Sequence, residues 1–123
     1  MMNPRIKTLW VEALRSKEYP QGKGNLKTQD GYCCLGVLCD LYLKEQSEEW
    51  KPSDFIEEDE VLTYKIDGWG HLPPESVVEW AELPGCNPGI MIEGADYVTE
   101  LTKLNDSLGK SFEEIADYIE NQL

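Results

Sequence analysis

The chain has 123 residues, of which 41% are hydrophobic, and its 24 acidic against 11 basic residues give a net charge of −13. This length predicts one compact domain over residues 1–123, and the aromatic content argues against a disordered chain. An acidic surface repels phosphates, so we expect no direct nucleic-acid binding. No apolar run approaches the roughly 20 residues that span a bilayer, and the N-terminus lacks the apolar segment of a signal peptide. We therefore expect a cytoplasmic protein with no membrane association.

The N-terminal segment carries the signals of a helix. Asn3 is a good N-cap residue and Pro4 suits the first helical position, so a helix is predicted over residues 4–16. Apolar residues recur there at spacings of three and one, which is the pattern of a helix with one buried face. A turn-rich loop over 19–25 and a short strand over 25–28 are expected to follow.

The longest apolar run of the chain, residues 31–43, contains Asp40 as its only charged residue. After a short strand at 32–33, its spacing favours a buried central helix over 34–44, although a run this short also allows a strand. Gly36 inside such a helix costs about 1 kcal/mol relative to Ala. Its presence indicates that another element approaches the helix closely at this point.

A charge-rich segment over residues 45–60 follows the apolar run. It lacks the alternating ligands and central glycine of a calcium loop, so we interpret it as a solvated acidic loop. Trp50 and Phe55 are expected to hold it against the body, with a turn or single helical turn at 52–54.

The middle of the chain alternates short strands with one short helix. Residues 61–66 are rich in β-branched and aromatic side chains and predict a strand, and Asp-Gly at 67–68 predicts a turn into a return strand over 69–72. Two prolines open a short helix that ends by residue 83. A short strand over 90–92 is expected to follow.

Two helices are predicted at the C-terminal end. The first runs over residues 96–105, with Asp96 as its cap and Val98 facing inward. The second covers 111–123 and opens with the capping box Ser111-x-x-Glu114. Together the elements predict an α+β fold: a mainly helical domain with a buried central helix, a C-terminal helical hairpin and one or two small antiparallel β-hairpins. The expected core comprises Leu9, Trp10, Leu14, Leu35, Val37, Leu38, Leu41, Trp80, Leu101, Leu104, Phe112, Ile115 and Ile119.

Three pieces of the chain carry a resemblance to other proteins. They are LRS..Y.Q at 14–21, GYCCLGVLCDL at 31–41 and LND..G.SF..IAD at 104–117. These pieces resemble a group of short uncharacterised proteins, many of them from tailed phages. The resemblance implies a phage-related origin and carries no activity with it.

The sharpest catalytic hypothesis rests on Cys34 and His71. A cysteine at a helix N-terminus has its thiolate stabilised by the helix dipole, and the histidine would act as its base. Cys34-Leu35-Gly36-Val37-Leu38 is also similar to the Cys-Ser-Gly-Leu-Val segment of NlpC/P60-type cysteine peptidases. However, Leu35 replaces the small polar residue of that segment, and no third orienting group is evident. The competing interpretation is a set of buried structural thiols.

Neither a metal nor a cofactor is expected. The other cysteines, Cys33, Cys39 and Cys86, lack the paired knuckle spacing typical of zinc ligands.

A binding role uses the residues around the Gly-rich loop after the first helix. Cationic, aromatic and amide groups there would bind an anionic ligand or an acidic partner, and the alternative is a hydrogen-bonded loop without a ligand. The candidate ligand-binding residues are Arg15, Tyr19, Gln21 and Lys23, with Lys17 and Lys27 beside them.

Acidic residues suggest a different partner. The acidic residues of the 45–60 segment and those on one face of the last helix would together imitate nucleic-acid phosphates and so inhibit a host enzyme. That face comprises Glu113, Glu114, Asp117 and Glu120. We favour a small phage-type accessory protein that acts by binding a host protein or a small anionic ligand and performs no catalysis.

Overall fold

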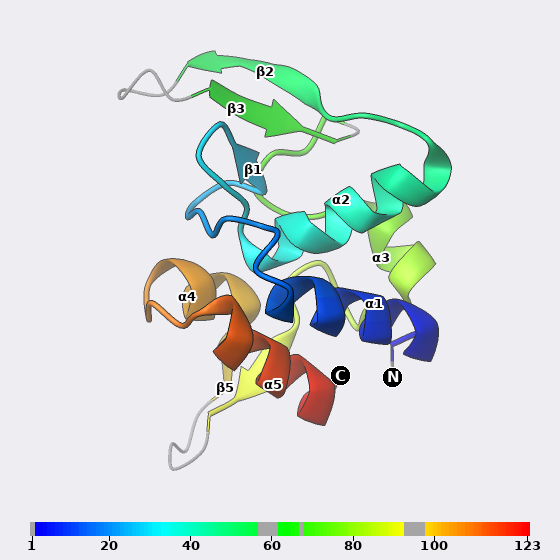
Figure 1. The fold of residues 1–123 in the computed structure, drawn as a ribbon, viewed down its shortest axis with the longest axis vertical. Helices are drawn as coiled ribbons and strands as arrows, with labels where there is room; N and C mark the ends of the chain where they lie inside the picture. Colours follow the sequence, from blue (N-terminus) through cyan, green and yellow to red (C-terminus); the bar gives the residue numbers. More distant parts are fainter. Residues whose placement is uncertain (1, 57–61, 67, 93–97) are drawn as a thin grey trace.

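The computed structural model describes residues 2–56, 62–66, 68–92 and 98–123 and shows an α+β fold (Figure 1). The helices are α1 (Pro4–Arg15), α2 (Cys34–Gln46), α3 (Glu75–Ala81), α4 (Leu101–Asp106) and α5 (Phe112–Gln122). The strands are β1 (Lys27–Thr28), β2 (Lys51–Ile56), β3 (Leu62–Lys65), β4 (Gly89–Met91) and β5 (Val98–Glu100). A sheet of strand order β1-β3-β2 lies on one side of α2, and α1 with α5 lies on the other (Figure 1).

The first and last helices begin where the sequence predicts, and they pack side by side. The Asn3 side chain accepts hydrogen bonds from the backbone N–H groups of Arg5 and Ile6, at 3.0 and 3.2 Å. Both bonds of the capping box between Ser111 and Glu114 are present at the start of α5. These caps satisfy N–H groups that have no partner within their own helix.

The central helix α2 is buried along most of its length, as predicted. The predicted close approach at Gly36 is also confirmed, because a methyl group there would overlap the carbonyl oxygen of Leu26. That same oxygen accepts a hydrogen bond from the backbone N–H of Cys33, at 3.2 Å. The loop before β1 therefore lies directly on the first turn of α2.

The three-stranded sheet differs from the predicted hairpins. β3 pairs antiparallel with β2 on one side and β1 on the other, whereas residues 69–72 contribute only a bridge between Trp69 and Ile66. The loop and turn expected in 45–60 are wrong for 51–56, which form β2. Pro52 is compatible with a strand here because β2 is an edge of the sheet. Residues 57–60, the side chain of Phe55 and Asp67 of the predicted turn lie outside the described part of the chain.

The helix expected over 96–105 starts later than predicted. Val98 belongs to β5, which pairs with β4, and its side chain is 60% exposed, so its inward placement is wrong. Helix α4 begins only at Leu101, whose N–H donates to the carbonyl of Pro88 at 3.1 Å. Pairing with β4 keeps the chain extended up to this point. Asp96, the predicted cap, lies outside the described residues.

The core agrees with the prediction except at a few positions. Leu9 is 37% exposed, because the buried stripe of α1 runs instead through Ile6, Trp10 and Leu14. Leu41 and Trp80 are half-buried and pack against the core from its edge. The remaining predicted core residues are buried, and they are joined by Met2, Leu26, Ile66, Val77 and Ile90.

Candidate functional site

A pocket of about 400 Å³ lies between the loop after α1, the turn after β1 and the outer face of α2. Its lining residues include Tyr19, Lys27, Thr28, Tyr32, Asp40 and Lys44. It combines charged groups, hydroxyl groups and aromatic rings, which is the mixture typical of ligand sites.

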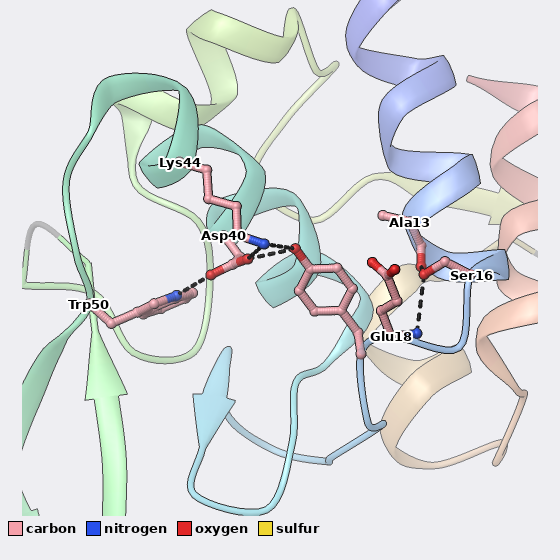
Figure 2. Close-up of polar contacts among 7 residues, drawn as sticks. Ala13, Ser16, Glu18, Asp40, Lys44 and Trp50 are labelled. Carbon is pink, nitrogen blue, oxygen red and sulfur yellow. Dashed lines mark hydrogen bonds and ion pairs between the residues drawn. The ribbon is translucent and has the colours of Figure 1, made fainter.

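Asp40 organises this pocket (Figure 2). One carboxylate oxygen accepts a hydrogen bond from the Tyr19 hydroxyl at 2.6 Å and forms an ion pair with the Lys44 ammonium at 3.2 Å. The other oxygen accepts a bond from the indole N–H of Trp50 at 3.0 Å. Asp40 is only 8% exposed, and these donors from three segments compensate for the burial of its charge. The same carboxylate thereby joins the loop after α1, helix α2 and Trp50, the residue directly before β2.

The charge states around Asp40 are well defined. Partial burial, and then the hydrogen bond to Asp40, raise the pKa of Tyr19 to about 12, so its hydroxyl stays neutral. The Lys44 ammonium also donates to the Tyr19 oxygen at 3.0 Å, and this bond raises the pKa of Lys44, with Asp40 adding to the effect. The pocket therefore holds a neutral phenol and a protonated ammonium near neutral pH.

Lys27 lies in an aromatic environment. Its ammonium nitrogen is 4.7 Å from the ring centre of Tyr64, 5.3 Å from that of Tyr32 and 5.7 Å from that of Trp50. Such ring faces stabilise a cation without neutralising it. In the described part of the chain Lys27 has no carboxylate within ion-pair distance, whereas Lys44 pairs with Asp40. Of the two pocket lysines, Lys27 is therefore the one whose positive charge is less neutralised by a carboxylate.

A second hydrogen-bond cluster holds the pocket loop against the C-terminal helices. The Gln21 amide donates to the Asn105 side chain and to the carbonyl of Lys110, both at 2.8 Å. Asn105, which is fully buried, donates in turn to the carbonyl of Gly22 at 2.8 Å. The Gln21–Asn105 pair therefore fixes the loop next to the residues that line the pocket.

The structure separates the four predicted ligand-binding residues. Arg15 pairs with Asp117 and Glu120 of α5, at 2.6 and 2.9 Å, and both bonds raise its pKa. Only Tyr19 of the four lines the pocket, and it also borders a smaller hollow of about 210 Å³ together with Gln21. Lys23 is exposed.

Four of the lining residues named above are absent from the residues predicted by sequence: Thr28, Tyr32, Asp40 and Lys44. One signal was available: Asp40 is the single charge in the buried run, and such a group needs polar partners.

The structure places Cys34 and His71 in different surroundings. Cys34 is the first residue of α2, as predicted, but it is fully buried and donates to the carbonyl of Leu101 at 3.7 Å. Burial raises the pKa of this thiol well above its usual value, so the helix terminus does not produce a thiolate. His71 is exposed, and its Nδ1 atom lies 2.8 Å from the carbonyl oxygen of Gly24.

The remaining cysteines give no metal centre among the residues that the structure describes, where no group of three or more His, Cys, Asp or Glu side chains is placed to hold an ion. Cys33 and Cys39 are buried and Cys86 is exposed, all as free thiols.

Fold and pocket together define a small α+β protein whose preformed polar pocket is walled by aromatic rings and carries two lysines. The chain belongs to a family described as a domain of unknown function, DUF8296, whose model matches residues 2–123. Searches of curated proteins and of solved structures gave no match. Among the described helices, none has the length and apolar character needed to cross a bilayer.

Proposed function

We propose that this protein acts by binding, and that the pocket beside α2 takes a small anionic ligand. The observation that carries the proposal is the pair of ammonium groups, Lys27 and Lys44, held over tyrosine rings at the same pocket. Their positions are set before any ligand arrives, so little conformational entropy is lost on binding.

Lys27 is the part of the pocket that favours an anion. Two carboxylates, Asp40 and Glu18, line the pocket beside the two lysines. Asp40 pairs with Lys44, whereas in the described part of the chain neither carboxylate lies within ion-pair distance of Lys27, which leaves this ammonium to attract the ligand. The chain as a whole carries −13 and repels anions at long range. Binding is therefore expected to depend on close contact with the lysines, and to weaken as salt screens them.

We extend the proposal to the biological setting. The three sequence pieces of the resemblance support a phage-type accessory protein that works in the cytoplasm as a single unit over residues 1–123. A host protein that presents an acidic group to the same pocket is the alternative to a free small ligand.

The other candidate functions receive less support. On α5, Asp117 and Glu120 pair with Arg15, Glu113 pairs with Lys17 and Glu114 with Lys110, so much of that face is neutralised within the chain. This argues against an acidic mimic of nucleic acid, although residues 57–60 lie outside the described structure. A cysteine hydrolase would need an accessible Cys34, and that thiol is buried.

The proposal is tested by titrating the ¹⁵N-labelled protein with inorganic phosphate at millimolar concentrations and following the backbone amide signals by NMR. We expect saturable shifts around Lys27 and Tyr32 in the wild type. Lys27→Gln should abolish them. Lys23→Gln is the matched control, because Lys23 is an exposed lysine outside the pocket lining, and it should leave them unchanged. An absence of saturable shifts in the wild type, or equal shifts in Lys27→Gln, would overturn the proposal.

A further inference from the structure

We infer that the anionic ligand is a phosphate joined to a planar ring, of which a 5′-phosphorylated nucleoside is the simplest natural form. This inference rests on the proposed anion-binding function and names the chemistry of the ligand at that same pocket. Three features support it: the fixed aromatic walls, the kind of cation present and the size of the pocket.

The aromatic walls are held in place. The rings of Tyr19 and Tyr32 meet edge to face with centres 5.1 Å apart, and Tyr32 also meets Trp50 edge to face at 6.3 Å. The Tyr19 hydroxyl is bound by Asp40 and Lys44, so this ring cannot swing out of the pocket without breaking both bonds. Half-buried rings that are fixed in this way suit stacking with a planar ligand, because little side-chain entropy remains to be lost.

The cations are of a kind that binds phosphate. Lysine ammonium groups act as point charges and commonly bind phosphates, whereas the planar fork of arginine matches carboxylates and phosphates alike. The pocket has two lysines, and among the described residues no arginine lines it. Arg15, at the end of α1, is engaged instead by Glu120 and Asp117 of α5.

The pocket is larger than an inorganic anion needs. Its volume of about 400 Å³ lies within the range of roughly 300–1,000 Å³ that is usual for organic ligands. The ammonium groups of Lys27 and Lys44 lie over the rings of Tyr32 and Tyr19, at 5.3 and 5.2 Å from the ring centres, so phosphate bound at Lys27 would place an attached planar ring beside these two side chains. The two halves of such a ligand would therefore contact two different kinds of side chain, and they can be tested separately.

The test is isothermal titration calorimetry with three probes: AMP, ribose 5-phosphate and adenosine. We expect AMP to bind roughly tenfold more tightly than ribose 5-phosphate, since stacking of one base on an aromatic side chain gives an effect of this order. Adenosine, which lacks the phosphate, should bind more weakly than AMP. Lys27→Gln should lower the affinity for AMP and the affinity for ribose 5-phosphate to a similar extent.

Variants at Tyr32 separate the ring from the anion. Tyr32→Leu should bring the ratio of AMP affinity to ribose 5-phosphate affinity down towards one, whereas Tyr32→Phe keeps the ring and should keep the wild-type ratio. Circular dichroism checks that both variants fold. If Tyr32→Leu does not fold, the ratio of the two affinities in the wild-type protein, for AMP and for ribose 5-phosphate, decides whether the planar ring contributes to binding.

Each failure has its own meaning. Equal affinity for AMP and ribose 5-phosphate would refute the inference that the ligand has a planar ring, and the proposed anion-binding function would not be affected. Equal affinity for adenosine and AMP would refute the inference that the ligand carries a phosphate. If no anion bound at all, the proposed function would fall with the inference. A 5′-phosphorylated oligoadenylate shows whether the natural ligand is a free nucleotide or the 5′ end of a strand. Weaker binding than AMP indicates a free nucleotide, and equal binding indicates a strand end. Both results agree with a phosphate joined to a planar ring.

Discussion

Gly36→Ala tests the contact on which the fold and the pocket both depend. The added methyl group would overlap the carbonyl oxygen of Leu26, and this oxygen already accepts a hydrogen bond from Cys33. Backbone atoms have to move apart, and overpacking of this kind costs about 3 kcal/mol at the upper end of its usual range. The better helix propensity of Ala returns about 1 kcal/mol. The free energy of unfolding should therefore fall by about 2 kcal/mol.

The assay is urea denaturation followed by far-ultraviolet circular dichroism. Gly85→Ala is the matched control, since a Cβ atom there meets nothing within 4 Å. Because alanine restricts the unfolded chain, this control should be neutral or stabilising by up to about 1 kcal/mol. If Gly36→Ala unfolded at the same urea concentration as the wild type, the close approach of Leu26 to α2 would be refuted.

Three further predictions concern the site and the cysteines. Asp40→Ala leaves the donors of Tyr19 and Trp50 without their acceptor and should lower the free energy of unfolding by about 2–3 kcal/mol in the same urea assay. Folding raises the pKa of Tyr19 from 10.0 to about 12, so the stability that this neutral phenol provides is complete below pH 10 and is lost as the pH rises through 12. Tyrosinate absorbance should show this late titration in the wild type, and Tyr19→Phe should remove one late-titrating tyrosine, while Tyr32, whose pKa is also raised by burial, remains. A thiol reagent should modify one cysteine of the native protein, Cys86, and none in Cys86→Ser until urea is added.

Sequence patterns were sufficient where the information is local. Helices α1 and α5 have both a side-chain cap and an apolar stripe, and each starts within a residue of its prediction. Gly36 indicated a close contact because glycine is unfavourable inside a helix, but it did not identify Leu26 as the neighbour. The misassigned segments are strands whose partners are decided by tertiary pairing. Pro52 suggested a turn, yet β3 lies beside this segment and pairs with it as a strand.

The candidate site was predicted less well for the same reason. Lys44 follows Asp40 by four residues on a helix, so this one ion pair could be read from spacing alone. Tyr19 and Trp50 lie 21 and 10 residues away along the chain, and nothing local indicates that both donate to the same carboxylate. Arg15 and Lys23 were equally plausible ligands by composition. Only the position of α5 shows that Arg15 is already engaged by other carboxylates.

The position of Asp40 explains why pocket and core are built from the same segment. The apolar run of α2 packs against α1, α3 and α4, and Asp40 is the single residue of the run that carries a charge. A buried carboxylate is tolerated only with several donors, so the chain must bring Tyr19, Lys44 and Trp50 to this point in order to fold. Those donors are also the groups that orient the pocket walls. Any ligand that binds beside Tyr19 should therefore stabilise the folded state as a whole.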